Sequence, residues 1–280
     1  SASKRGSVIL HPEGRNMLSF NQYVRAQSLE EAYELCQKKS NVVLGGMLWL
    51  KMQSGNRGTA IDLCDLGLDQ IEETPQEYRI GAMVSLRALE KHAGLNALTQ
   101  GALAESVQHI VGVQFRNVAT LGGSIYGRFG FSDVLTLFMA LDARVELDHA
   151  GIMSVKEFAD FPRQTRDILV RVIVPKTERK TVYLSMRNTE TDFPVLTCAL
   201  SELEGRYTCV VGARPMKAVF FDDEKQILAQ GITMEVAEAF AEDIASRARF
   251  GSNIRGGADY RRKICSVLVR RAALALQEVS

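Results

Sequence analysis

The sequence predicts an α+β protein that is built in at least two units. Helical segments that begin at capping residues are interspersed with short apolar strands that end at glycine or proline. The composition changes after Pro175, where a run of charged residues predicts a boundary between units. Of the 280 residues, 46% are hydrophobic and 24% are charged, which is typical of a globular chain with a sizeable core.

The first residues differ from the rest of the chain. Residues 1–16 show no helical or strand pattern, whereas Met17 opens a regularly patterned segment. We interpret residues 1–16 as a leader or an artificial addition, with a natural flexible arm as the alternative. Basic residues in this segment are not followed by an apolar stretch, so the segment does not match a secretory signal.

A helix, a strand and a glycine pair come next. Ser28 and Glu31 form a capping box that predicts a helix over the following residues. The lysines at 38–39 are expected to close this helix, because positive charge is favourable at a helix C-terminus. Residues 41–44 predict a short buried strand that ends at Gly45-Gly46.

The middle of the chain mixes strands with helices. A helix over residues 132–141 is apolar nearly all round, so it is expected to be buried. Residues 114–117 are expected to form a turn. The other strands predicted by periodicity are 59–63, 78–80, 143–147 and 168–174. One further helix is predicted to begin at Ser85, and another to cover residues 102–111.

Beyond Pro175 the pattern predicts strands followed by two helices. The strands are 183–186, 195–200 and 207–211, and the helices are 233–249 and 259–277. Glu204-Gly205 is expected to form the hairpin turn between the last two strands. In the last helix, Tyr260 is expected to face inward and Arg261 to lie on the helix surface or at a subunit interface.

Charge and hydropathy exclude several classes of protein. A net charge of +1 argues against a protein that follows nucleic-acid phosphates. No apolar run approaches the roughly 20 residues of a membrane span, and we expect a cytoplasmic protein. The five cysteines and four histidines lack the spacing of zinc or iron–sulfur sites. We therefore expect buried free thiols, no metal ligands in this chain, and any metal chemistry on another chain.

Two glycine pairs are the most informative functional signal. Gly45-Gly46 ends a predicted strand, and the second pair lies in Gln114-Phe115-Arg116-Asn117-Val118-Ala119-Thr120-Leu121-Gly122-Gly123-Ser124-Ile125. Glycine lacks Cβ, so its backbone can approach a ligand closely and adopt positive φ. Consecutive N–H groups can then form a concave anion site. Two such loops on separate units could hold one long anionic cofactor between them.

These motifs resemble those of a known family. The segment 114–125 is similar to the second flavin-binding motif of the molybdenum hydroxylases, in the FAD-binding medium subunits of the xanthine dehydrogenase and carbon monoxide dehydrogenase type. Leu44-Gly45-Gly46-Met47-Leu48 resembles the first motif. Arg255-Gly256-Gly257-Ala258-Asp259-Tyr260-Arg261-Arg262 resembles a stretch of the family's C-terminal domain. The resemblance covers about residues 17–277.

The resemblance implies a fold and its division. The fold would be α+β, with a two-subdomain FAD-binding domain of the vanillyl-alcohol oxidase type followed by a small α/β C-terminal domain. The FAD-binding domain would span 17–175, with subdomains at about 17–66 and 67–175, and the C-terminal domain would span 178–280.

The resemblance also implies an oxidoreductase subunit that is active only within a complex. An iron–sulfur subunit with two-iron clusters would deliver electrons to the FAD of this chain, and a molybdopterin subunit would hydroxylate the substrate. NAD or another acceptor would take the electrons onward, and purine or other N-heterocycle oxidation is the expected reaction. No proton-transfer constellation is present in the sequence, so no catalytic residue is assigned to this chain.

Cofactor contacts follow from the same resemblance. Backbone N–H groups of the glycines would meet the FAD pyrophosphate, and hydroxyl groups would donate to phosphate or ribitol oxygens. The implied binding residues are Leu44, Gly45, Gly46, Met47, Leu48, Trp49, Ile110, Ala119, Thr120, Gly122, Gly123, Ser124, Asp133, Leu169 and Arg187.

Some of these residues have a more specific implied role, and each has a structural alternative. Asp133 would contact the sugar region or simply complement the helix dipole. Arg187 would place a cation near flavin N1, or it is a solvated strand residue. Trp49 and Leu169 would lie by the flavin ring, and Ile110 would lie near the adenine; core packing is the alternative for all three.

One departure from the family pattern supports a second hypothesis. The family usually carries a polar pair after the first glycines, whereas this chain has Met47 and Leu48. The loss of two side-chain contacts, at about 1 kcal/mol each, predicts FAD binding that is retained but weakened. The alternative is a flavin-less structural or assembly subunit of the same complex.

Overall fold

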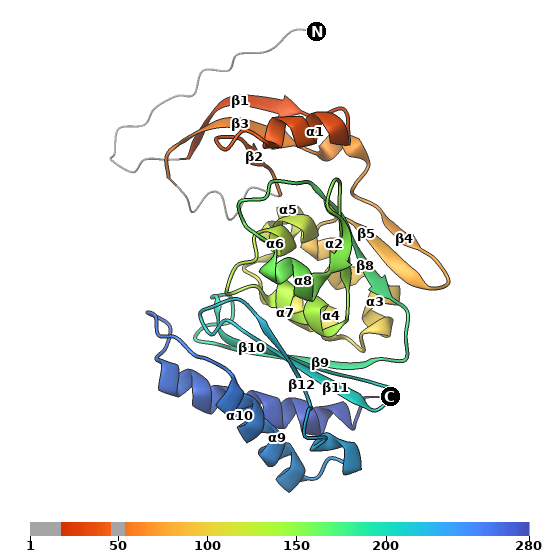
Figure 1. The fold of residues 1–280 in the computed structure, drawn as a ribbon, viewed down its shortest axis with the longest axis vertical. Helices are drawn as coiled ribbons and strands as arrows, with labels where there is room; N and C mark the ends of the chain where they lie inside the picture. Colours follow the sequence, from red (N-terminus) through yellow and green to blue (C-terminus); the bar gives the residue numbers. More distant parts are fainter. Residues whose placement is uncertain (1–17, 46–53, 280) are drawn as a thin grey trace.

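The computed structural model describes residues 18–45 and 54–279, and within these residues three sheets follow one another along the longest axis of the molecule (Figure 1). A three-stranded sheet lies at one end, a five-stranded sheet with a cluster of helices forms the middle, and a four-stranded sheet with two long helices lies at the other end. Residues 1–17 and 46–53 include the predicted leader and Gly46, Met47, Leu48 and Trp49, which all lie outside the described residues.

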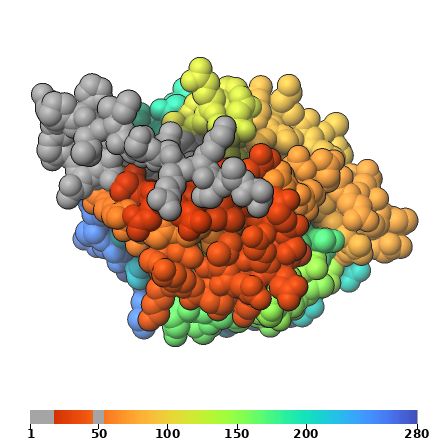
Figure 2. Space-filling view, turned by 90° about the horizontal axis from the view of Figure 1, so that it is seen from above, coloured from red at the N-terminus to blue at the C-terminus, as the bar shows by residue number. Residues whose placement is uncertain are grey.

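The N-terminal unit is a small parallel sheet with one helix packed on it. Its elements are β1 Ser19–Arg25, α1 Leu29–Cys36, β2 Val42–Val43 and β3 Asn56–Asp62, with the strands in the order β1-β3-β2. Ala32 and Cys36 of α1 are buried in a core that also contains Ile168 and Val170 from the middle unit. This unit covers one end of the middle unit when seen from above (Figure 2).

The N-terminal cap of α1 is formed by Ser28, as predicted, but the helix ends earlier than predicted. The hydroxyl of Ser28 accepts the N–H of Glu31 at 3.1 Å, whereas the Glu31 carboxylate accepts the N–H of Gln27 instead of that of the capping residue. The helix ends at Cys36, before the lysines at 38–39, so the prediction that they close it is wrong.

The middle unit is an antiparallel sheet in the order β4-β5-β8-β6-β7, with helices packed against it. Its elements are a 3-10 turn Cys64–Leu66, β4 Ile71–Glu73, β5 Glu77–Gly81, α2 Leu86–Lys91, α3 Ala93–Leu98, α4 Ala102–Gln108, α5 Val113–Val118, α6 Leu121–Tyr126, α7 Asp133–Ala140, β6 Arg144–Leu147, β7 Gly151–Ser154, α8 Val155–Asp160 and β8 Leu169–Pro175. Every residue of α7 is buried, as its apolar sequence predicts.

Two predictions for the middle unit are wrong. The expected turn at 114–117 lies within α5, and Gly122 and Gly123 lie in the first turn of α6 instead of in an open loop. The helix α6 starts here because Thr120 is its N-cap, with its side-chain oxygen 3.1 Å from the Gly123 nitrogen.

The C-terminal unit is an antiparallel sheet between α7 and two long helices. Its elements are β9 Lys180–Arg187, β10 Pro194–Leu203, β11 Arg206–Gly212, β12 Val219–Asp222, a 3-10 turn Leu228–Gln230, α9 Met234–Arg247 and α10 Ala258–Leu276. The strand order is β12-β11-β10-β9. Tyr183, Ala199 and Val210 face the core of the middle unit, whereas Cys198 and Cys209 face α9 and α10. The Glu204-Gly205 turn forms as predicted, with positive φ at both residues.

Two predictions for side chains at the start of α10 are wrong, because the residue expected inside is exposed and the residue expected on the surface is buried. Tyr260 is 45% exposed, and Arg261 is fully buried. Burial of the Arg261 guanidinium is possible because it donates to the carbonyl oxygens of Val195 and Gly251 at 2.9 Å, and also bonds Gly256 and the Asn253 side chain. Among the cysteines, Cys64 is exposed, so the expectation of buried thiols is wrong there.

Candidate cofactor-binding site

The first pocket lies between the N-terminal sheet and the middle unit and has a volume of about 340 Å³. It brings both glycine motifs together. Six of the predicted binding residues line it: Leu44, Gly45, Thr120, Gly122, Gly123 and Leu169. Residues that are separated by more than a hundred positions in the chain therefore meet at one cavity.

The glycines are required here because the two motifs touch. A Cβ on Gly45 would lie 2.6 Å from the Cα of Gly123, and a Cβ on Gly123 would collide with the carbonyl oxygen of Gly45. A Cβ on Gly122 would lie 2.7 Å from the carbonyl oxygen of Ala82. None of these three glycines has positive φ, so close backbone packing, and not a left-handed conformation, explains them.

The backbone N–H groups of the second motif are largely paired within the protein. The Gly122 N–H donates to the carbonyl of Ala82 at 2.8 Å, and the Gly123 N–H donates to the Thr120 hydroxyl oxygen at 3.1 Å. The predicted run of free N–H groups is therefore not formed at this glycine pair. The Thr120 hydroxyl accepts from Gly123, which leaves its own proton available to donate into the pocket.

Basic side chains line the same pocket, and sequence reasoning missed them. Among the described residues that line it, the cations are Lys39, Arg57 and Arg166, and the one acidic residue is Asp167. Arg166 is held in place by the carbonyl oxygens of Cys36 and Asn41. These cations come from distant parts of the chain, so no local signal predicts that they meet. A pocket with hydroxyl, glycine and excess positive charge suits a diphosphate.

We expect Thr120→Val to affect both the fold and the cofactor. Loss of the N-cap of α6 should lower the free energy of unfolding by about 1 kcal/mol. Loss of the hydroxyl should also weaken FAD binding, whereas Thr120→Ser keeps both functions. Urea denaturation and flavin titration of the two variants check this; equal FAD affinity for the valine and serine variants would contradict the hydroxyl contact.

A second, smaller pocket of about 80 Å³ lies at the junction of the middle and C-terminal units. It is lined by four more of the predicted residues: Ile110, Ser124, Asp133 and Arg187. Phe129 lines both pockets. Its ring is stacked on Phe131 with centroids 5.3 Å apart, and Phe131 in turn packs on Phe193 at 4.3 Å. The pocket therefore combines an ion pair with aromatic walls.

Asp133 and Arg187 form a buried ion pair at this pocket. The Asp133 carboxylate accepts from Arg187 Nη2 and from the hydroxyl of Tyr183, each at 2.5 Å. Burial raises the pKa of Asp133, and the bonds from Arg187 and Tyr183 oppose that rise. Burial next to Asp133 raises the pKa of Tyr183 well above its usual value, so its hydroxyl stays protonated and donates. Tyr183 was not predicted as part of the site.

An unsatisfied donor lies beside the same pocket. The Nε of Arg187 is buried and has no hydrogen-bond partner among the described residues, although its Nη1 donates to the Asp192 carbonyl at 2.7 Å. Buried donors are normally paired, so this group suits a bound molecule with an acceptor atom.

The remaining predicted residues have structural roles in the second motif. The Ser124 hydroxyl donates its proton to the carbonyl of Thr120 at 3.0 Å, so in this arrangement it is not the donor to the cofactor that was predicted. Ala119 is buried and lines neither pocket; its carbonyl accepts the N–H of Leu86 at 2.9 Å. Its contribution is to hold the segment that leads into Thr120.

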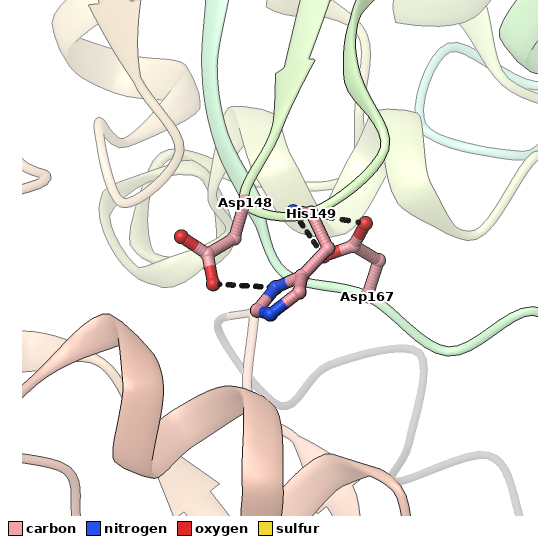
Figure 3. Close-up of side chains that lie close together, drawn as sticks. All are labelled: Asp148, His149 and Asp167. Carbon is pink, nitrogen blue, oxygen red and sulfur yellow. Dashed lines mark hydrogen bonds and ion pairs between the residues drawn. The ribbon is translucent and has the colours of Figure 1, made fainter.

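The structure also brings together Asp148, His149 and Asp167, a grouping that the chain spacing did not indicate (Figure 3). His149 Nδ1 lies 2.9 Å from Asp148, and its ring is stacked on Tyr33 of α1. Asp167 accepts the N–H groups of His149, Ala150 and Ile168. The stacking of His149 on Tyr33 joins the middle unit to the N-terminal unit, and Asp167 lies in the lining of the first pocket.

Closely packed glycines, a cationic cavity and an adjoining aromatic pocket define a site for an extended anionic cofactor. Residues 18–177 match the family described as FAD binding domain in molybdopterin dehydrogenase, and the chain belongs to this family. The resemblance to FAD-binding medium subunits of molybdenum hydroxylases is thus confirmed, with FAD as the cofactor of this chain.

Relatives and solved structures agree with this assignment. The chain is 27% identical to the nicotine 6-hydroxylase medium subunit of Paenarthrobacter nicotinovorans, over 89% of this chain and 94% of that protein. It is 25% identical to the glyceraldehyde dehydrogenase medium chain of Sulfolobus acidocaldarius, over 89% and 96%. The structure of carbon monoxide dehydrogenase from Hydrogenophaga pseudoflava has the same fold, with a TM-score of 0.80, 23% identity, and coverage of 91% and 97%. Within the described residues, the helices are too short or too polar to span a membrane.

Proposed function

We propose that this chain is the FAD-carrying electron-transfer subunit of a molybdenum hydroxylase complex. Bound FAD supplies a two-electron carrier, and the chain's own residues bind and orient it. The observation that carries the proposal is the meeting of Gly45 with Thr120 and Gly123 at a cationic cavity. The proposal includes a fold of the vanillyl-alcohol oxidase type, with an FAD-binding domain at 17–175 and a C-terminal domain at 178–280.

We propose that FAD spans both pockets, with the diphosphate in the first and the isoalloxazine ring in the second. Ile110 was assigned to the adenine end and Arg187 to the ring end, but both line the second pocket. Aromatic walls and a buried cation suit the ring better than the adenine, because a cation near N1 favours the reduced form. Ile110 would then lie by the ring, and Leu169, which the resemblance places by the ring, would instead lie near the diphosphate in the first pocket.

The partners and the reaction are part of the same proposal. An iron–sulfur subunit would deliver electrons, and a molybdopterin subunit would oxidise the substrate. The name of the nicotine 6-hydroxylase relative supports an N-heterocycle as the substrate class; purines belong to that class. NAD or another acceptor would receive the electrons. A xanthine dehydrogenase-like activity of this kind would arise only in the complex, to which this chain would contribute the bound FAD.

Flavin titration of the purified chain tests the function. We expect stoichiometric FAD with flavin absorbance in the visible range and micromolar or tighter affinity, together with molybdenum and iron in the complex that co-purifies with the chain. A purified chain that contains no extractable FAD and takes up none on reconstitution would favour the alternative, a structural or assembly subunit, for which Met47 and Leu48 are the motivating observation.

A further inference from the structure

A strained backbone position lies in the wall of the second pocket. Val111 has a φ of +49°, in the left-handed region that β-branched residues rarely adopt. Its side chain is 39% exposed, so packing around the side chain does not impose this conformation. Val111 and its neighbour Ile110 both line the pocket. Strain of this kind persists only where the surroundings hold it in place.

A buried arginine holds the turn. Arg116 of α5 is 5% exposed, and its Nη1 lies 3.3 Å from the carbonyl oxygens of both Ile110 and Val111. Its Nε donates to Glu90 at 2.9 Å. One guanidinium therefore fixes two successive carbonyl groups on one side and a carboxylate on the other, which a lysine could not do.

Glu90 keeps the guanidinium in position. It is part of α2 and also pairs with Arg87 at 2.9 Å. Burial acts to raise the pKa of Glu90, but the bonds from Arg87 and Arg116 outweigh it and the pKa is lowered. The carboxylate stays charged, so Arg116 has a fixed anchor on the side away from the pocket.

We propose that Arg116 is a positioning residue for the flavin: it holds the Ile110–Val111 turn in its left-handed form and thereby shapes the wall of the second pocket. The inference deepens the proposed function and rests on it, because it assigns the ring to that pocket. Arg116 lies in the same motif as Thr120 and Gly123, so one segment of chain shapes both halves of the site.

A rescue experiment tests the role of Arg116. In the full chain, Arg116→Met should weaken FAD binding about tenfold and shift the visible circular dichroism of the bound flavin, because the turn relaxes. Val111→Gly should restore both signals in the Arg116→Met background, since glycine adopts positive φ without strain. A general defect in folding would not be repaired by a glycine on the exposed turn.

Arg87, the other arginine that pairs with Glu90, provides the control for Arg116. Arg87→Met removes the other arginine on Glu90 without touching the turn, and it should leave FAD affinity within about twofold of the parent. Wild-type affinity and flavin dichroism in Arg116→Met, or an Arg116→Met defect that Val111→Gly does not repair, would overturn the inference. Failure of the parent chain to bind FAD would instead overturn the proposed function, so the two failures are distinguishable.

Discussion

Replacing Gly123 with valine is expected to weaken FAD binding by at least about a hundredfold, which corresponds to the loss of one or two hydrogen bonds to a charged group. The cause is the contact between the two motifs. Any Cβ at Gly123 collides with the Gly45 carbonyl, so the N-terminal unit must move away from α6. The first pocket lies between these elements and would lose its shape.

The middle and C-terminal cores contain no part of the Gly45–Gly123 contact, so far-ultraviolet circular dichroism should remain close to that of the parent. Gly112→Ala is the control, because Gly112 lies just before the second motif and a Cβ there meets nothing within 4 Å. Its FAD affinity should match the parent. Full flavin occupancy in Gly123→Val would show that the motif contact is not needed for the cofactor.

A double-mutant cycle sharpens this prediction. Gly45→Ala should also weaken FAD binding, because its Cβ would lie 2.6 Å from the Cα of Gly123. Once one substitution has separated the two segments, the second added side chain should lower the FAD affinity little further. The combined variant should therefore lose less than the sum of the two single losses. Additive losses would indicate that the two glycines act independently.

Replacing Asp133 with asparagine is expected to lower the free energy of unfolding by about 3–5 kcal/mol, the usual cost of removing one partner of a buried ion pair. Arg187 would keep its charge in a position where it is 7% exposed. Tyr183 would also lose a charged acceptor. Because Asp133 begins α7 and the other two residues lie on β9, the change should loosen the junction between the middle and C-terminal units.

The stability measurement has an internal check and a surface control. Asp133→Asn with Arg187→Met should be less destabilising than Asp133→Asn alone, because no buried charge is left unpaired. Glu238→Gln breaks the exposed pair with Arg270 and should cost at most about 1 kcal/mol. Urea denaturation of these variants decides the point; similar losses for Asp133→Asn and Glu238→Gln would contradict the importance of the buried pair.

Local signals in the sequence predicted much of the fold. Ser85 and Ser132 cap helices where the pattern placed them, because a cap depends on residues within one turn. The burial of α7 follows from its uniformly apolar composition. The predicted strands at 78–80 and 207–211 lie within β5 and β11, since strand patterns are also local.

Long-range contacts account for what the sequence did not reveal. The glycine pair that was predicted to lie in a loop is in the first turn of α6, where the carbonyl of the distant residue Ala82 accepts the N–H of Gly122. The burial of Arg261 depends on carbonyl groups from β10 and from the loop before α10. Side-chain acceptors and donors that lie far away in the chain leave no periodic pattern.

For the candidate site too, local motifs were visible in the sequence and long-range contacts were not. Six of the residues that the resemblance implied line the first pocket, but the basic residues Lys39, Arg57 and Arg166 were found there only in the structure. No sequence pattern indicated that Ile110 and Arg187 line the same pocket, because they belong to different units. Sequence motifs indicated that a cofactor binds, and the two pockets support the proposed placement of its diphosphate and its ring.

The crystal structure of the full chain saturated with FAD tests the central claim most directly. We expect electron density for the diphosphate against Gly45 and the Thr120–Gly123 turn, with the isoalloxazine ring beside Asp133 and Arg187. Density that leaves the first pocket empty, or that places the ring away from the second pocket, would contradict the account.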